Sequence, residues 1–414
     1  MSKKVVITGI GIISPLANNV KDYWAGLEAG KSGVTKITKF NPDDREIPVK
    51  IAAEVKNFDP KNFNIDRKLL RGMDTFSMFG MAAAKEAIAM AKLPESDIDK
   101  ERVGVVVGSG IGGMEAYQKN VMDFNTKNKL SPFFIPMIIT DMCSGLIAIE
   151  YGYMGPNFSI STACATANHS ILDSYHIIKR GDADIMVTGG TEGSVNDLTV
   201  GAFAIAQALS RRNDAPEKAS RPWDRDRDGF VVGEGAGVLV LESEESAKKR
   251  GATILAEVVG AGMSADAYHM TAPHPEGKGA ALCMKRAIEC AGIKLEDVQS
   301  VNAHGTSTEL GDIAETEAIK LVFGAHAKKL KVNSTKSMIG HLLGAAGGAE
   351  AVAVVLEIMH GKIHPTINLD NPGEGLDLDY TANKAVACDL KYALSNSFGF
   401  GGHNCSVIFG RYQG

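Results

Sequence analysis

The sequence lacks the features that mark disulfide-rich secreted proteins, membrane-spanning proteins and proteins with cysteine-rich zinc sites. Only six cysteines are spread over 414 residues, with no CxxC pair, which excludes a disulfide framework and a cysteine-rich zinc site. The longest apolar stretch, residues 130–149, is interrupted by Pro132, Pro136 and Asp141, whereas a membrane-spanning helix needs about 20 mostly apolar residues. We therefore expect no membrane segment and a reduced, cytosol-like compartment.

An excess of one charge is also missing. The 44 Lys and Arg residues and the 49 Asp and Glu residues give a formal net charge of −5, which argues against a dedicated nucleic-acid-binding protein. The 45 glycines and 14 prolines are close to average usage, so collagen-like and low-complexity chains are excluded. With 44% hydrophobic and 22% charged residues, the composition is that of a folded protein.

Short β-branched runs alternate along the chain with longer helical patterns. Strands are predicted over residues 4–8, 103–107, 158–160, 185–188, 238–241, 255–259, 300–302, 393–397 and 406–409. Helices are predicted over residues 67–91, 165–180, 279–291, 313–323 and 346–360. The alternation indicates an α/β fold, and the lack of a Pro- or Ser-rich linker predicts that its parts pack tightly.

One glycine-rich motif raises a dinucleotide-binding alternative. Residues 108–113 read GSGIGG, match GxGxxG and follow a predicted strand. A dinucleotide site also needs an acidic residue about 20 positions further on, at the end of a second strand, but residues 130–134 read LSPFF. We therefore interpret residues 108–113 as a tight strand–helix turn. A dinucleotide-dependent oxidoreductase is kept as the alternative from a different class of enzyme.

Three segments place reactive side chains where a strand gives way to a helix. Cys164, in the run STACAT, lies at the predicted start of a helix, where the helix dipole favours a thiolate. His304, in NAHGT, follows a predicted strand, and His341 ends the run STKSMIGH. Each residue alone is more often structural, but together they offer a nucleophile and two imidazoles. Loops beyond strand ends are where α/β folds place their chemistry.

These three segments resemble the β-ketoacyl-acyl carrier protein synthases, the condensing enzymes that elongate fatty acids. Further matches are GDAD at 181–184, SRPWD at 220–224, RDGF at 227–230 and NSFGFGG at 396–402. The resemblance runs from Val5 to the C-terminus and is strongest to the synthase II type, with synthase I and polyketide ketosynthases as alternatives. It implies a thiolase-like α/β fold of five αβαβα layers in two pseudo-symmetric, tightly packed halves, residues 1–250 and 251–414.

The resemblance also implies an acyltransferase that performs a decarboxylative Claisen condensation. An acyl group moves to Cys164 as a thioester, malonyl-acyl carrier protein loses CO2, and the carbanion attacks the thioester to give 3-oxoacyl-acyl carrier protein. By the same resemblance, His304 and His341 stabilise the enolate, and the backbone N–H groups of Cys164 and Phe400 form the oxyanion hole. Phe400, flanked by glycines, is also expected to gate the site.

Supporting residues follow from the same resemblance. Lys336 orients the site and pairs with Glu350. Thr306 and Thr308 hydrogen-bond the phosphopantetheine arm, and Ile111 limits access of the acyl chain. None of these roles requires a cofactor or a metal, and none is expected.

The expected partners are acyl- and malonyl-loaded acyl carrier protein and a second copy in a homodimer, with no nucleic acid and no membrane. Because the carrier protein is acidic, docking is expected on Arg67, Lys68 and Arg71. Gly72 and Gln207 stand where the family often has a basic residue, which weakens this patch. The expected location is the cytoplasm, or an organelle stroma or matrix if a transit peptide has been removed.

Related enzymes with other chemistry differ at the predicted site. A chain-length partner without catalysis would lack the nucleophile, which Cys164 supplies. Starter synthases have Asn in place of the second histidine, where this chain has His341. Thiolases use a second reactive cysteine near the C-terminus, but Cys405 here follows the NSFGFGG run that is typical of synthases.

Overall fold

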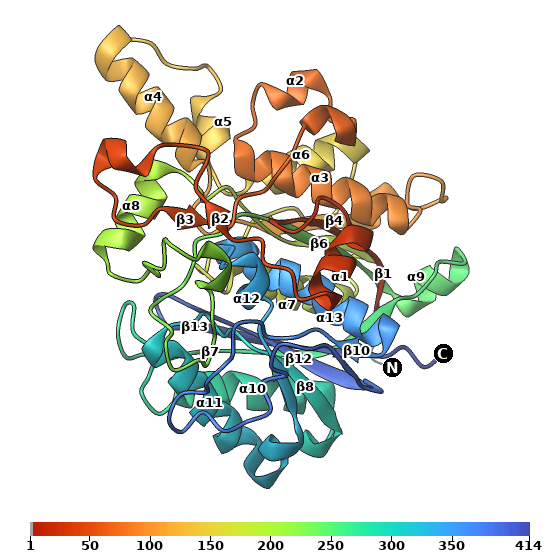
Figure 1. Cartoon of the computed structure of the whole chain (residues 1–414). Helices are drawn as coiled ribbons and strands as arrows, with labels where there is room; N and C mark the ends of the chain where they lie inside the picture. The colour runs from red at the N-terminus through yellow and green to blue at the C-terminus, as the bar shows by residue number, and fades with distance from the viewer. Residues whose placement is uncertain (1–2) are drawn as a thin grey trace.

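Residues 3–414 are described by a computed structural model, and they form five alternating layers of helices and strands (Figure 1). One outer layer holds α3 (Thr75–Met90) and α6 (Met142–Tyr151), and the other holds α10 (Lys278–Ala291) and α11 (Glu309–Phe323). Between the two layers of strands lie α7 (Thr166–Arg180) and α13 (Ala346–His360). The other α-helices are α1 (Val20–Glu28), α2 (Arg67–Leu70), α4 (Met114–Lys127), α5 (Phe134–Ile138), α8 (Asp197–Ile205), α9 (Glu244–Lys249) and α12 (Lys336–Ile339).

Nine strands are hydrogen-bonded in the order β4-β5-β6-β1-β7-β13-β12-β8-β9. Their bounds are β1 Val5–Ile13, β4 Val103–Gly108, β5 Ile185–Glu192, β6 Gly235–Ser243, β7 Ala256–Ala265, β8 Val298–Asn302, β9 Lys331–Asn333, β12 Tyr392–Gly399 and β13 His403–Gly410. Two small sheets pair β2 (Thr35–Lys36) with β3 (Ile51–Ala52) and β10 (Lys362–Ile363) with β11 (Val386–Ala387). Every residue of β1 is buried, because helices cover both faces of the sheet.

The strand order repeats between the two halves of the chain. In the first half β4 pairs parallel with β5, β5 antiparallel with β6, and β6 antiparallel with β1. In the second half β8, β12, β13 and β7 repeat this pattern, parallel and then twice antiparallel. The halves join where β1 pairs with β7. The five layers and this repetition confirm the expected fold of two pseudo-symmetric halves.

The same repetition explains one wrong prediction. Residues 158–160 are not a regular strand: the segment lies beside β4, as β9 lies beside β8, but with a single parallel bridge between Val105 and Asn157. The other predicted strands are confirmed, most of them longer than expected.

The predicted single helix over residues 67–91 is also wrong, because the chain forms two helices there, α2 and α3, with a break before Asp74. The Asp74 side chain accepts the N–H of Phe76 and so begins α3.

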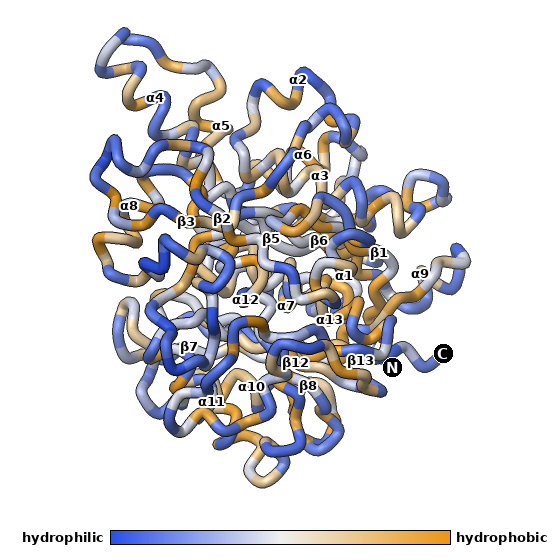
Figure 2. Tube along the Cα trace, viewed as in Figure 1, coloured by the Kyte–Doolittle hydropathy of each residue, from blue (hydrophilic) through white to orange (hydrophobic). Residues whose placement is uncertain are grey.

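Helix α13 forms the centre of the core. The stretch Leu343–His360 is the one helical segment in residues 3–414 that is long and apolar enough to cross a membrane, yet 89% of it is buried inside the protein. It contacts β6 on one side and β12 on the other. A Cβ at Gly348 would lie 2.4 Å from the carbonyl oxygen of Gly237, so only glycine allows this close approach. Figure 2 shows hydrophobic segments along β1 and β13, next to this centre.

Candidate active site

Cys164 lies in a strained turn immediately before α7. Ala163, the residue before it, has a φ of +49°, a left-handed conformation that side chains disfavour and that functional turns often contain. The turn is held by Thr166, whose hydroxyl donates to the carbonyl oxygen of Ala163 at 2.7 Å. This turn directs Cys164 into a cavity of about 520 Å³.

The cavity brings together the three reactive side chains that the sequence predicted. Cys164, His304 and His341 all line it, although Cys164 lies at the start of α7, His304 in the loop after β8 and His341 two residues after the end of the short helix α12. The two imidazole rings lie edge to face, with centroids 5.3 Å apart and an interplanar angle of 86°. Further lining residues from the sequence predictions are Thr306, Thr308 and Phe400.

Both imidazoles are uncharged hydrogen-bond donors. Burial lowers the pKa of His304 and of His341 well below the ordinary value, and the Lys336 charge lowers both further. The backbone N–H of Leu343 donates to Nδ1 of His341 at 3.3 Å. In a neutral ring the proton must then be on Nε2, so His341 is able to donate from that nitrogen.

Lys336 is the main positive charge at the site. It is the first residue of α12, only 1% exposed, and it forms an ion pair with Glu350, which is 0% exposed. This pair confirms the contact expected from the resemblance. Burial raises the pKa of Glu350 to about 7, while Lys336 acts in the opposite direction.

The structure corrects the expectation of a thiolate at Cys164 in the free site. Burial raises the pKa of the Cys164 thiol to about 12. Lys336 and the backbone N–H groups of Phe400 and Cys164 lower that pKa, so stabilising groups for a negative charge are in place. The thiol proton must therefore leave as the acyl group arrives.

Gly399, at the end of β12, lets the backbone of Phe400 approach Cys164. A Cβ at Gly399 would lie 2.6 Å from the carbonyl oxygen of Thr162 and 3.1 Å from the backbone N of Cys164. The backbone N–H groups of Cys164 and Phe400 both lower the pKa of the Cys164 thiol, which places two hydrogen-bond donors beside the reactive sulfur. The Phe400 ring is 39% exposed, at the mouth of the cavity.

A buried carboxylate that the sequence did not single out holds His304. Glu315, in α11, accepts the backbone N–H of His304 at 2.9 Å, that of Gly305 at 2.8 Å and the Asn396 amide at 3.0 Å. Burial raises the pKa of Glu315, and these hydrogen bonds oppose the shift. A glutamate in the second turn of the helix that follows NAHGT was the available signal.

A second buried carboxylate explains the GSGIGG motif. Glu192, the last residue of β5, accepts the Ser109 hydroxyl at 2.7 Å and the backbone N–H groups of Gly110, Ile111 and Gly344 at 2.9, 3.2 and 2.9 Å. In a dinucleotide fold the N–H groups of such a turn face a phosphate. Here they bind a carboxylate of the chain itself, which leaves the oxidoreductase alternative without a phosphate site.

The remaining predicted residues lie outside this cavity. Ile111 is half-buried and packs against the apolar cluster that includes Cys164. Arg67 and Lys68 on α2, and Arg71 just after it, are exposed. Within residues 3–414 none of the three basic side chains forms an ion pair.

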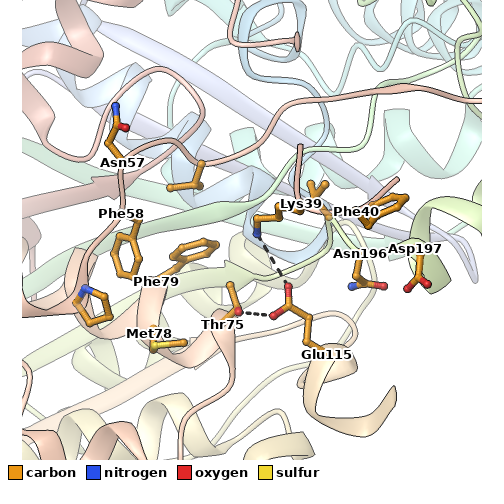
Figure 3. Close-up of a pocket in the computed structure, with 13 residues that line it drawn as sticks. Lys39, Phe40, Asn57, Phe58, Thr75, Met78, Phe79, Glu115, Asn196 and Asp197 are labelled. Carbon is orange, nitrogen blue, oxygen red and sulfur yellow. Dashed lines mark hydrogen bonds and ion pairs between the residues drawn. The ribbon is translucent and has the colours of Figure 1, made fainter. Parts of the chain in front are cut away.

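A second cavity, of about 740 Å³, lies away from Cys164 (Figure 3). Its apolar wall includes Phe40, Phe58 and Phe79. Its one cation, Lys39, is paired with the fully buried Glu234 at 2.6 Å and lies 3.9 Å from Glu115. This cation is therefore neutralised within the protein and not free for an anionic ligand.

Comparisons with known proteins identify the family of this chain. Family models described as "Beta-ketoacyl synthase, N-terminal domain" and "C-terminal domain" match residues 2–247 and 255–370. The chain is similar to the 3-oxoacyl-[acyl-carrier-protein] synthase 2 of Coxiella burnetii, with 52% identity over 411 residues and 99% of each chain covered. The enzyme of the same name from Staphylococcus aureus is 49% identical over 415 residues, which cover 100% of this chain and 99% of the other.

Solved structures give the same result. A ketosynthase solved in complex with its type II PKS acyl-carrier protein superposes with a TM-score of 0.93 at 33% identity, and 100% of each chain is covered. A β-ketoacyl synthase from Burkholderia phymatum has a TM-score of 0.91 at 34% identity, covering 99% of this chain and 100% of the other. Given matches to both domain models and to full-length relatives at about half identity, the chain belongs to the β-ketoacyl synthase family.

Proposed function

We propose that this protein is a 3-oxoacyl-acyl carrier protein synthase of the synthase II type, which elongates fatty acids by decarboxylative condensation. The observation that carries the proposal is a cysteine beside two uncharged imidazoles in one cavity, with two backbone N–H groups at the sulfur. The relatives at about 50% identity are named as 3-oxoacyl-acyl carrier protein synthases, whereas the similar polyketide ketosynthase structure is only 33% identical. This difference supports fatty acid elongation over polyketide synthesis. Their bacterial sources support a cytoplasmic enzyme.

The first half-reaction transfers the acyl group to Cys164. The sulfur attacks the thioester carbonyl of acyl-carrier protein, and the oxygen becomes negative in the tetrahedral intermediate. The N–H groups of Cys164 and Phe400 stabilise that oxygen. The proton that the Cys164 thiol loses ends on the sulfur of the departing carrier thiol, so the step leaves no net charge in the site.

The second half-reaction removes CO2 from the malonyl thioester. The electron pair of the breaking C–C bond moves into an enolate, whose oxygen needs hydrogen-bond donors. Neutral His304 and His341 supply N–H groups without adding a second buried charge beside Lys336. The carbanion then attacks the acyl carbon on Cys164, releases the sulfur and gives the 3-oxoacyl product.

The direct experiment supplies the purified protein with hexanoyl-carrier protein and malonyl-carrier protein. Equal amounts of CO2 and 3-oxooctanoyl-carrier protein are expected, with a hexanoyl adduct on Cys164 when malonyl substrate is omitted. Mass spectrometry locates the adduct. Absence of both the adduct and CO2 release would overturn the proposed function, and saturable NADPH binding would favour an oxidoreductase.

We propose that the acyl carrier protein docks near Arg67, Lys68 and Arg71, which are exposed and free of ion pairs within residues 3–414. A solved relative in complex with its carrier protein supports such a partner. Replacing all three residues by Glu is expected to raise KM for carrier-linked substrate about tenfold or more at low salt, because charge reversal repels an acidic partner. Acylation by a small thioester such as hexanoyl-N-acetylcysteamine is the control and should not change; an equal loss with both substrates would contradict this docking site.

We also propose that the protein is a homodimer. Helix α4, helix α5 and the loops beside them expose large apolar side chains, and α4 projects from the body of the molecule (Figure 1). These side chains are Tyr117, Val121, Met122, Phe124, Leu130, Phe133, Ile135 and Ile139. Such a patch is unusual on a free surface. Light scattering should therefore give twice the mass of the 43.9-kDa chain, and a monomer at micromolar concentration would contradict the proposal.

Ile111 is proposed to limit the acyl chain, because it packs in the cluster that contains Cys164. Ile111→Phe is expected to reduce elongation of long acyl chains by about tenfold or more, while short chains react nearly as before. The measurement is activity against acyl-carrier proteins of increasing length, together with a melting curve. A uniform loss at every length with a lowered melting temperature would show plain overpacking, which costs about 1–3 kcal/mol.

A further inference from the structure

A second buried polar cluster lies behind the two histidine-bearing loops and has no part in the chemistry described above. Its members are Asn302, Asn333, Thr335, Glu357 and His364, and each is 0% exposed. Five polar side chains in a dry core cost free energy unless they bind one another, so their mutual contacts decide what the cluster does.

Glu357, near the end of α13, is the anchor of this cluster. Its Oε1 accepts the Asn333 amide at 2.7 Å and the backbone N–H of His364 at 3.1 Å. The same Asn333 amide donates to the carbonyl oxygen of His364 at 3.1 Å. Glu357 thereby fixes the end of β9 to the segment that follows α13.

Two members of the cluster, Asn302 and Asn333, are the last residues of β8 and β9, the strands that lead to the site. The Asn302 amide donates to Thr335 Oγ1 at 2.9 Å and to Asn333 Oδ1 at 3.3 Å. Since Thr335 Oγ1 accepts this bond, its own proton is free for Nε2 of His364, 2.9 Å away. Nδ1 of His364 lies 3.0 Å from the carbonyl oxygen of Pro365 and carries the ring proton.

The positions of these residues in the chain connect the cluster to the chemistry. Asn302 ends β8 two residues before His304, and Thr335 directly precedes Lys336. We propose that Glu357 is a positioning residue of the condensing site, which through this cluster fixes the loops that carry His304 and Lys336. The inference rests on the proposed function, because it concerns the geometry of the decarboxylation step.

Burial favours the uncharged form of both titratable groups in the cluster, which guides the choice of variants. Burial raises the pKa of Glu357 to about 8 and lowers the pKa of His364 to about 4. A protonated carboxyl group is closely matched by an amide, so Glu357→Gln keeps the acceptor oxygen. Glu357→Leu removes it and leaves the Asn333 amide and the His364 N–H without this acceptor.

The test separates the two half-reactions. In Glu357→Leu, decarboxylation of malonyl-carrier protein should fall about 10- to 100-fold, because a misplacement of about 1 Å can cost about 10²-fold. Acylation of Cys164, measured by mass spectrometry and normalised to folded protein, should stay within about threefold of the wild type. Glu357→Gln should restore decarboxylation. Val355→Ala, buried on the same helix without polar contacts, is the matched control for lost packing and should not separate the half-reactions.

Thr335→Val gives a second variant of similar shape, should Glu357→Leu fail to fold. It removes the hydroxyl that joins Asn302 to His364 and is expected to show the same selective loss. Equal loss of both half-reactions in the folded variants, or unchanged decarboxylation in Thr335→Val, would overturn the positioning role. A wild-type protein inactive in both half-reactions would instead refute the proposed function.

Discussion

Cys164→Ala is expected to abolish condensation, with a loss on the order of 10⁶-fold, the size seen when a covalent nucleophile is removed. Cys164 is the one cysteine in residues 3–414 that lines the cavity. Cys143, Cys283 and Cys405 are also buried, but none of them lines this cavity. The measurement is product formation together with the mass of the acylated protein.

Cys290→Ala is the matched control, because Cys290 is an exposed cysteine on α10. It should keep wild-type activity and the acyl adduct. Iodoacetamide should label the exposed Cys290 without loss of activity, and only labelling of Cys164 should correlate with lost activity. Condensation that survives in Cys164→Ala, or an adduct on another cysteine, would refute the assignment of the nucleophile.

His304→Ala and His341→Ala are each expected to slow malonyl decarboxylation about 10²–10³-fold, the usual effect of removing one donor to a developing oxyanion. Both rings are neutral and line the cavity beside Cys164. Acyl transfer to Cys164 should persist at least in part, because its oxyanion is stabilised by backbone N–H groups. Released CO2 and the acyl adduct are measured separately.

His341→Asn and His360→Ala complete that comparison. Asn keeps an N–H donor and should retain part of the decarboxylation. His360 is exposed and stacks on Trp24 with ring centroids 4.9 Å apart, outside the cavity, so its loss should not change either half-reaction. If both alanine variants released CO2 at the wild-type rate, the enolate-stabilising role would be refuted.

The sequence predicted elements best where local composition decides the structure. Residues 103–107 and 185–188 are apolar, β-branched runs, and the structure has β4 and β5 there. Helix α6 was missed because it is apolar at most positions and has no clear amphipathic stripe. Helix α4 was missed although Tyr117, Val121 and Phe124 recur at helical spacing. Residues 158–160 have strand composition, but the only bridge of this segment to β4 is at the preceding Asn157. Strand formation requires partners that composition does not reveal.

The sequence by itself determined the kind of chemistry. Cys164, His304 and His341 are the residue types that a condensation needs, and each lies next to a helix or strand end that local patterns could predict. Motif resemblance added Lys336 with Glu350, and the structure confirms that contact. These features depend on neighbours close in the chain, which is why a single sequence reveals them.

Only the tertiary structure decided the environment of those residues. The position of Cys164 at a helix start predicted a thiolate, but burial raises the pKa of its thiol to about 12. This burial depends on every segment that packs around the sulfur. The tertiary structure also gave Glu192, Glu315 and Glu357 their roles, since each carboxyl group binds N–H groups from a different part of the chain. Burial and long-range hydrogen bonds are properties of the packed chain, and no local sequence pattern encodes them.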